Sequence, residues 1–259
     1  MRNLIPILLA VVVLSSGCDC DGYSCTSEGC YADDDSPQYQ TLEDCLSVCD
    51  EQIPGGCGSP VLHEGYAYST VQIGDQCWFS ENCRYLPVVS PSSANSTSDP
   101  YYYVYDYEGT DVGAAVTTSN YETYGVLYNW PAVMTEGICP SGWHIPSDGE
   151  WMELEMSLGM SEAEANDTGY RGTDEGYQMK SISGWNSNGN GSNSSGFTGL
   201  PGGYRYFGGF NLNGDDGSWW SASESGSYSW RRKLDNFYGS VGRNYNGQDN
   251  GFSARCVRD

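Results

Sequence analysis

The sequence predicts an exported α+β protein rich in loops, in which a small cysteine-rich module precedes one larger domain. Glycine accounts for 34 of the 259 residues, about 13%, against a usual ~7%. Charged residues are only 17%, against a usual ~25%. Six of the 11 cysteines lie between Cys20 and Cys57, and four are spread from Cys77 to Cys256. This composition is typical of short strands joined by many turns, and it argues against a helical bundle.

The first 17 residues are predicted to be a signal peptide. Arg2 supplies a positive charge, and Leu4–Leu14 is an apolar stretch of 11 residues, too short to span a bilayer as a helix. Small residues then precede Cys18, which resembles a bacterial lipoprotein signal, in which Cys18 is lipidated. The alternative is an ordinary secretory signal in which Cys18 joins a disulfide. Without Cys18, ten cysteines remain, an even number that can close into five disulfides.

Residues 18–57 are predicted to form the cysteine-rich module, because a core of about 40 residues is marginal without disulfides. Residues 41–52 predict its one helix, with Thr41 as cap and an apolar face formed by Leu42, Cys45, Leu46 and Cys49. The Gly/Pro-rich stretch 54–60 then marks a hinge before the larger domain, 58–259.

The larger domain is predicted to open with a β-hairpin. Ala67–Ile73 alternates as a strand does, and Gly74-Asp75 is a turn that returns into Gln76–Phe79, with Trp78 facing inward. Tyr101–Tyr107 predicts a strand whose rings cover one or both faces of a sheet.

One strong helix is expected after Pro146. Ser147 is its N-cap and Glu150 completes an S-x-x-E capping box. A second short helix is expected around Ser161–Asn166. From Gly169 onward the pattern indicates short strands and glycine turns, and Asn186–Ser195 predicts an exposed loop.

The net charge of −23, with only two lysines, disfavours nucleic acid as a partner, because such a chain repels DNA, RNA and anionic lipid headgroups. The cofactor that this acidity would suit is Ca²⁺, which prefers carboxylate and carbonyl oxygens. Residues 211–217 offer Asn213, Asp215 and Asp216 as ligands, although the segment fails the EF-hand pattern, with Asp216 at the position of the required glycine.

The sequence contains no recognisable catalytic set. It has no G-x-S-x-G motif, and its only histidines are His63 and His144. His144 precedes the predicted helix and is interpreted as a structural residue packed under it. Neither histidine has zinc-ligand spacing to a cysteine pair. We therefore expect a protein that is not an enzyme.

Two disulfides are expected in the larger domain. Cys139 lies at the approach to the predicted helix and Cys256 in the last strand, so a bridge between them would tie these elements together. Cys77 and Cys83 are then the remaining local pair, although swapped pairings stay open. Among exposed side chains, Tyr101, Tyr103 and Tyr105 are the candidates for contacting a ligand, because alternate Tyr residues face opposite sides of a strand.

An ordered set of motifs resembles the Fibrobacter succinogenes major paralogous domain, a family of exported bacterial proteins that are often lipoproteins. The motifs are IGDQCWFSEN, YGVLYNWPA, CPSGWHIPSDGEW, SGWN, GFTGLPGGYR, WWSASE and GFSARCV. More distantly, GWHIPSDGEW and the closing GFSARCV are similar to the C-type-lectin-like fold and its formylglycine-generating-enzyme branch. This resemblance implies irregular antiparallel sheets with one or two helices, but it implies no activity.

The resulting hypothesis is a lipoprotein of the bacterial cell envelope, at the outer membrane or cell surface. It is anchored to the membrane through Cys18 and binds a polysaccharide or a surface protein through loops of a lectin-like domain. The alternatives are an oxidase of the formylglycine-generating type, a carbohydrate hydrolase, and a purely structural envelope protein.

Overall fold

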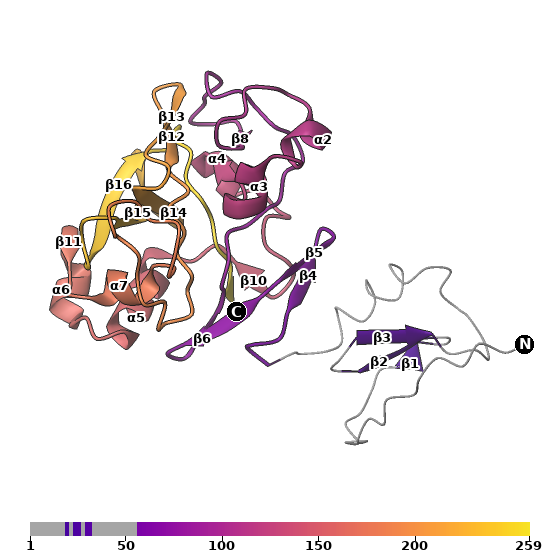
Figure 1. The fold of residues 1–259 in the computed structure, drawn as a ribbon, viewed down its shortest axis with the longest axis horizontal. Coiled ribbons are helices and arrows are strands. Elements are labelled where there is room, and N and C mark those ends of the chain that lie inside the picture. The colour runs from indigo at the N-terminus through magenta and orange to yellow at the C-terminus, as the bar shows by residue number, and fades with distance from the viewer. Residues whose placement is uncertain (1–18, 21–22, 27–28, 33–55) are drawn as a thin grey trace, which may run out of the picture. The chain divides into compact units, whose positions relative to one another are not determined.

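The computed structural model describes residues 19–20, 23–26, 29–32 and 56–259 (Figure 1). The chain divides into two compact units, Met1–Gly55 and Gly56–Asp259. In the first unit the described residues form an antiparallel sheet of three strands in the order β1-β2-β3, namely β1 (Asp19–Cys20), β2 (Tyr23–Thr26) and β3 (Gly29–Ala32). The signal peptide, the lipidation of Cys18 and the helix expected over 41–52 lie outside the described residues.

The second unit begins with two hairpins, and the second of them contains the turn predicted at Gly74-Asp75. The strands are β4 (Val61–His63), β5 (Tyr66–Tyr68), β6 (Thr70–Ile73) and β7 (Gln76–Phe79). Gly74 has φ of 59°, which suits a tight turn between β6 and β7, and Trp78 is fully buried. The expected hairpin is therefore confirmed over Thr70–Phe79. The single strand expected over Ala67–Ile73 is wrong, because the chain breaks at Ser69 and β5 pairs with β4 instead.

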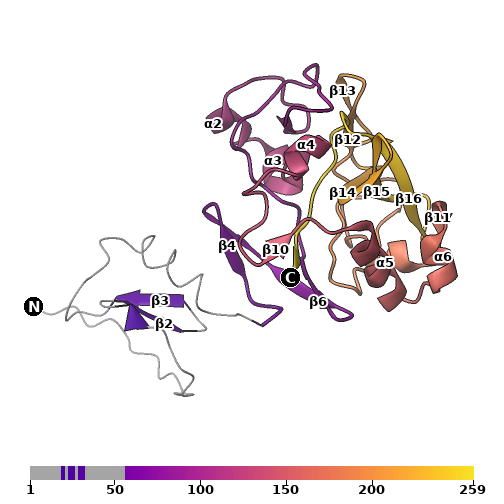
Figure 2. The same cartoon turned by 180° about the vertical axis from the view of Figure 1, so that it is seen from behind.

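The end of the chain returns to this hairpin. A four-stranded antiparallel sheet has the order β10-β17-β7-β6, with β10 (Trp143–His144) and β17 (Val257–Arg258) as its additional strands. Val257 pairs with Trp78 of β7, and Figure 2 shows the C-terminus beside β6 and β10. Segments about 180 residues apart in sequence thus close the unit.

A second four-stranded antiparallel sheet has the order β11-β16-β15-β14. Its strands are β11 (Gly169–Arg171), β14 (Asp216–Ser225), β15 (Tyr228–Asp235) and β16 (Val241–Gly247). Helices α5 (Asp148–Ser157), α6 (Glu162–Asn166) and α7 (Glu175–Met179) gather at one side of this sheet (Figures 1 and 2). The α+β class expected from composition is confirmed.

Local sequence chemistry explains where α5 and α6 begin. Ser147 accepts from the Glu150 N–H while the Glu150 carboxylate accepts from the Ser147 N–H, so the predicted capping box is present. Ser161 and Glu164 form a second capping box at α6. The expected helices at 147 and at 161–166 are therefore confirmed, whereas α7 was not expected.

The rest of the second unit is built from short elements. It contains α2 (Val112–Ala115), α3 (Ser119–Tyr124) and α4 (Trp130–Val133), and two-stranded sheets pair β8 (Tyr102–Tyr103) with β9 (Leu127–Tyr128) and β12 (Tyr204–Tyr206) with β13 (Gly209–Asn211). The single strand expected over Tyr101–Tyr107 is wrong beyond Tyr103, because Asp106 adopts φ of 61° and the chain turns.

Tryptophans form much of the core, as expected. Trp78, Trp151 and Trp219 pack in one cluster with Phe197, while Trp220 packs in a neighbouring cluster. All four Trp are fully buried. The Trp-centred motifs are therefore folding determinants, since burial of such large side chains dominates core energetics.

One disulfide agrees with the sequence and one corrects it. Cys139 is bonded to Cys256. Cys77 is bonded to Cys57 and Cys83 is a buried free thiol, so the expected Cys77–Cys83 pair is wrong. Cys57 therefore belongs to the larger unit rather than to the cysteine-rich module. The physical reason is that β7 carries Cys77 beside the start of the unit, while Cys83 points toward Cys256.

A buried ion network joins α5 to the second sheet. Asp148 accepts from Arg232 and Arg243, each at 2.6 Å. Glu155 accepts from Arg232 at 2.6 Å and from Arg171 at 2.5 Å. Burial alone would raise the pKa of Asp148, but Arg243 and Arg232 together lower it. The network therefore holds α5 against the face of the sheet that carries these arginines.

Candidate functional site

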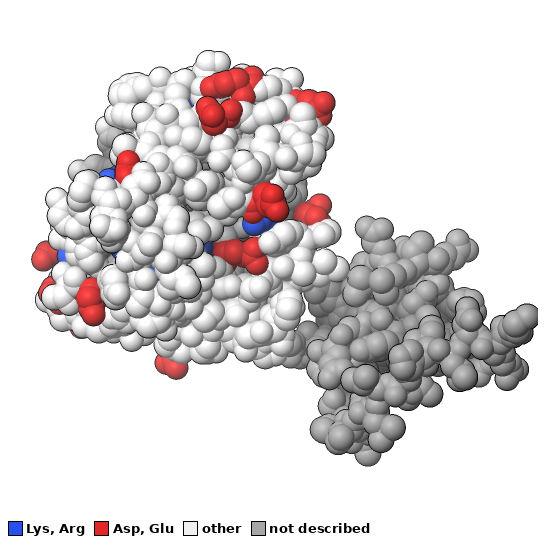
Figure 3. All heavy atoms as spheres, in the orientation of Figure 1, with Lys and Arg blue, Asp and Glu red and all other residues white. Residues whose placement is uncertain are grey.

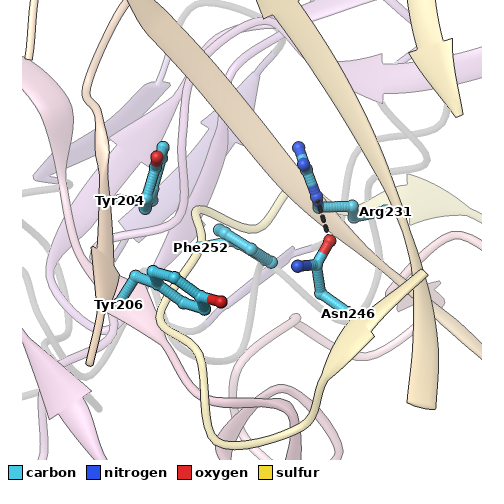
Figure 4. Close-up of a pocket in the computed structure, with 5 residues that line it drawn as sticks. All are labelled: Tyr204, Tyr206, Arg231, Asn246 and Phe252. Atoms are coloured by element: carbon cyan, nitrogen blue, oxygen red, sulfur yellow. Dashed lines mark hydrogen bonds between the residues drawn. The ribbon is translucent and has the colours of Figure 1, made fainter. Parts of the chain in front are cut away.

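A small hollow lies where the β12–β13 hairpin meets the second sheet (Figure 4). Its volume is about 70 Å³, and it is lined by Tyr204, Tyr206, Arg231, Asn246 and Phe252. Figure 4 shows the two Tyr rings on one side, Arg231 and Asn246 on the other, and the Phe252 ring between them. We call this the Arg231 pocket.

Strand alternation explains why these side chains converge. Successive residues of a strand point to opposite faces, so Arg232 turns toward Asp148 of α5 while Arg231 turns to the other face. Tyr204 and Tyr206 are two residues apart in β12 and lean the same way. Three segments distant in sequence thus meet at one sheet face.

Arg231 is the electrostatic centre of the pocket. Its Nε donates to Asn246 Oδ1 at 2.5 Å, and its Nη1 donates to Ser218 Oγ at 2.9 Å. Its Cζ lies 5.1 Å from the centroid of the Phe252 ring, within cation–π range. Burial lowers the pKa of Arg231, and attraction by Asp216 offsets this only in part.

The neighbouring cation on this face is fully paired. Lys233 Nζ lies 2.8 Å from Asp216 Oδ2 and 3.2 Å from Asp235 Oδ2. Burial alone would lower the pKa of Lys233, but Asp216 above all raises it. Both carboxylates are therefore paired with Lys233. Among the described side chains, none forms an ion pair with Arg231.

An exposed aromatic turn adjoins the pocket at Tyr206. Phe207 connects β12 to β13, is 88% exposed and has φ of 49°. Its ring centroid lies 4.1 Å from that of Tyr206, which is 41% exposed. The left-handed region is unfavourable for a bulky side chain, and two-residue hairpin turns prefer Asn there. Such a residue, strained and exposed together, points to a function for the turn.

A second, larger hollow of about 410 Å³ lies between the β6–β7 turn and α5. Asp75 and Glu153 line it, together with Gln76, Met156 and backbone of the turn. It contains no aromatic ring and no cation, and Gln76 donates to Glu153 at 3.1 Å. It therefore offers less to a ligand than the Arg231 pocket.

The structure does not bring the three candidate tyrosines together on an exposed face. Tyr103 is fully buried and donates to the Ala94 carbonyl at 2.7 Å. Tyr101 is half-buried and stacks on Tyr103, with ring centroids 6.3 Å apart. Tyr105 is half-buried against Phe210, with ring centroids 5.2 Å apart. These rings serve mainly to pack the region around β8.

The candidate acidic loop is also held by internal contacts. Asp215 accepts from Asn236 at 2.7 Å and from Asn186 at 3.1 Å, whereas Asp216 is buried beside Lys233. Asn213 is half-buried, and its amide nitrogen has no hydrogen-bond partner. Within residues 56–259, no group of three or more His, Cys, Asp or Glu side chains is placed to hold a metal ion.

The loop Asn186–Ser195 is largely exposed, as expected, but it is fixed by close backbone packing. A Cβ atom at Gly189 would lie 2.5 Å from the Asn236 carbonyl oxygen, and one at Gly191 would lie 2.3 Å from that of Tyr177. Glycine is required at both positions for this approach. The loop therefore supports the end of β15.

His144 lies beside the start of α5, as expected, but it is half-exposed rather than packed under the helix. Its Nε2 lies 2.7 Å from Glu150 Oε1 and its Nδ1 lies 2.5 Å from Asp259 Oδ1. Partial burial alone would lower the pKa of His144, but the hydrogen bonds to Asp259 and Glu150 raise it. The imidazole therefore joins the start of α5 to Asp259, and it stays half-exposed.

Sequence reasoning missed the residues that form the Arg231 pocket. One usable signal was present: YSWRRKLD over 228–235 places Arg231 and Lys233 on one face of a strand and Arg232 on the other. Two cations at alternate positions of a strand predict that the face they share is polar rather than part of the hydrophobic core.

The disulfide bonds indicate the cellular compartment of the larger unit. The two disulfides of the larger unit are typical of extracytoplasmic domains. In the part of the chain that the structure describes, no helix has the length and apolar character needed to cross a membrane. On the face drawn in Figure 3, carboxylates lie in small separate groups with uncharged surface between them.

Comparison with known proteins identifies the domain. No curated protein and no solved structure matches the chain. The family model of the Fibrobacter succinogenes major domain matches residues 71–258, which include every residue that lines the Arg231 pocket. This match covers most of the 259 residues. The chain therefore belongs to the Fibrobacter succinogenes major domain family.

Proposed function

We propose that this protein is a non-catalytic carbohydrate-binding protein of the bacterial cell envelope, with the Arg231 pocket as its binding site. The observation that carries the proposal is the meeting of the exposed Tyr206 ring and the half-buried Tyr204 ring with the polar groups of Arg231 and Asn246 in one hollow. Aromatic faces pack against the C–H groups of a sugar ring, and convergent polar side chains bind its hydroxyls. The natural ligand is a polysaccharide or a surface glycan.

A C-type-lectin-like fold is part of the same proposal. It is supported by the pairing of the last strand, β17, with β7 and β10. The Cys139–Cys256 disulfide beside the capped helix α5 supports it as well. Binding is expected at the β12–β13 turn and the adjoining sheet face, not at the acidic loop 211–217.

The arrangement of cysteines and carboxylates favours binding over the enzymatic alternatives. Cys139 and Cys256 are bonded to each other, so they do not offer an oxidase a free reactive pair. The Arg231 pocket contains no carboxylate, whereas a glycoside hydrolase acts with two. Asp75 and Glu153 line the larger hollow, which lacks a ring for a sugar to stack on.

The lipid anchor on Cys18 is proposed from its signal pattern alone. Of the 11 cysteines, four form the two disulfides and Cys83 is free. Six cysteines remain, Cys18 among them, so an even count no longer favours removing Cys18. Metabolic labelling with a fatty-acid analogue is expected to label the wild type and not Cys18→Ser; equal labelling of both would contradict the anchor.

The binding proposal is tested with the purified mature protein on a glycan array, with and without Ca²⁺. We expect binding to a defined set of saccharides that Tyr206→Ser abolishes. Tyr238→Ser is the matched control, because Tyr238 is also an exposed tyrosine, at 50%, outside the pocket. Absence of binding under both conditions would overturn the proposal and favour a structural role.

A further inference from the structure

We infer that the ligand of the Arg231 pocket is an acidic saccharide, a uronate, whose carboxylate binds the Arg231 guanidinium while its ring packs on Tyr206 and Phe207. This inference rests on the proposed function and makes it specific in ligand class. It is carried by the unused donors of Arg231, by the size of the hollow and by the position of the exposed aromatic turn.

Arg231 retains the donors that a carboxylate needs. A guanidinium has five N–H groups, and Arg231 uses one on Nε for Asn246 and one on Nη1 for Ser218. One N–H on Nη1 and two on Nη2 remain. The Nη1 and Nη2 edge can therefore donate two parallel hydrogen bonds to the two oxygens of one carboxylate. Neither present partner is an anion, so the positive charge of Arg231 is not directly paired.

The other arginines of the sheet, unlike Arg231, are each paired with a carboxylate. Arg232 and Arg243 share Asp148, and Arg171 is bonded to Glu155. On the pocket's own face the row of Arg231, Lys233, Asp216 and Asp235 balances in total charge. Both carboxylates contact Lys233, so the positive charge of this row is concentrated on Arg231, at the pocket.

The size of the pocket limits what enters it. A cavity needs roughly 10–15 Å³ to hold one water molecule. The hollow of about 70 Å³ therefore holds a few water molecules or a substituent such as a carboxylate, but not a whole sugar ring. The ring of such a sugar would remain outside, where the Tyr206 and Phe207 side chains lie.

The test measures binding of the mature protein by isothermal titration calorimetry. The probes are oligosaccharides of galacturonate, glucuronate and mannuronate, each compared with its methyl ester, which keeps the ring but removes the charge. At low salt we expect at least one acid to bind about tenfold or more tightly than its ester, because charge-assisted bidentate hydrogen bonds are lost in the ester. This preference should shrink as salt is raised.

Arg231→Gln is expected to make acid and ester bind alike. Arg84→Gln is the matched control, since it makes the same charge change outside the pocket, and it should retain the preference. Thermal melts establish that each variant is folded. The acid–ester comparison in the wild type remains decisive if Arg231→Gln does not fold.

The outcomes separate the two proposals. If saccharides bind and Tyr206→Ser abolishes binding, but acid and ester bind equally, the uronate inference is wrong and the proposed function stands. Binding of sulfated but not uronic saccharides also overturns the inference. If no saccharide binds at all, the proposed function fails, and the inference fails with it.

Discussion

The Sγ atom of Cys83 lies 3.5 Å from the Sγ atom of Cys256, which is itself bonded to Cys139. Cys83 is fully buried, and burial raises the pKa of its thiol to about 12. The thiolate is the nucleophile in disulfide exchange, so this thiol is unreactive despite its proximity to a disulfide.

Cys83 is expected to resist alkylation in the native protein at pH 8 and to react once the larger unit is unfolded in denaturant. The reason is that almost none of the thiol is ionised and no reagent reaches it. Peptide mass spectrometry after iodoacetamide treatment measures the modification at Cys83 itself. Rapid labelling of Cys83 under native conditions would contradict the buried position.

Removing Cys139 is expected to redirect the disulfide. In Cys139→Ser, Cys256 is left with Cys83 as its neighbour, and oxidative folding should produce a Cys83–Cys256 bond. Non-reducing peptide mapping detects it. In the double variant Cys139→Ser/Cys83→Ala this rescue is blocked, and the free energy of unfolding should fall by about 2–5 kcal/mol. Cys83→Ala alone keeps the native bond and serves as the control.

Glu155→Gln is expected to lower the free energy of unfolding by about 3–5 kcal/mol, because it leaves two buried arginines without their shared carboxylate. Glu153→Gln is the matched control, since Glu153 lies on the same helix but is exposed, and it should change the value by less than about 0.5 kcal/mol. All eight tryptophans lie in the larger unit, so denaturant titration followed by fluorescence reports on it. Equal effects of the two substitutions would show that the network is unimportant.

His144 is expected to make stability depend on pH. Its pKa is raised above 6.5 in the folded state, so its contribution is complete below about pH 6.5 and is lost as the pH rises through the folded value. The pKa of Glu150 is lowered, despite its partial burial, by Ser147 and His144, so its contribution is lost as the pH falls below about 4.5. The two effects together favour the folded state most between about pH 5 and 6.5.

Urea titrations at pH 6 and pH 9 test this dependence. Wild type should lose more stability than His144→Gln between these pH values, by no more than about 1 kcal/mol because the imidazole is half-exposed. An identical change in the two proteins would show that the carboxylates do not hold the protonated imidazole.

Phe207→Asn is expected to stabilise the fold by about 1 kcal/mol, because Asn tolerates the left-handed backbone of the turn far better than Phe. The same change should abolish saccharide binding, since it removes the exposed ring that contacts Tyr206 of the pocket. Phe237→Asn is the control: Phe237 is 77% exposed but its φ is not positive, so neither effect is expected. Loss of both stability and binding in Phe207→Asn would argue that the ring has a structural role.

Features that depend on neighbours in sequence were predictable. The capping box of Ser147 and Glu150 and the turn at Gly74 use contacts within four residues. The bond between Cys139 and Cys256, 117 residues apart, was also predicted, from their positions at the approach to the helix and in the last strand. The family motifs identify the domain because they consist of core and turn residues that are contiguous in sequence.

Other features that depend on long-range placement were not predictable. Cys77 and Cys83 are close in sequence, but Cys77 lies within β7 and is bonded to Cys57, whereas Cys83 follows the strand and lies beside Cys256. The Arg231 pocket needs the register between β14, β15 and β16 as well as the position of β12, and none of these is encoded in a local pattern. The expected tyrosines were placed by strand propensity, which a single turn at Asp106 overrides.

The Cys57–Cys77 disulfide has a mechanical consequence for a chain that is held at its N-terminal end. Tension arriving at Cys57 passes directly through the sulfur bridge to β7, and the 20-residue segment up to Cys77 carries none of it. Val257 pairs with Trp78, the residue next to Cys77, so the load enters the strand that receives the end of the chain. Reduction would release about 70 Å of slack at that point, which single-molecule pulling with and without reductant would register. In a chain held in this way, the bridge would therefore keep the load off the segment between Cys57 and Cys77.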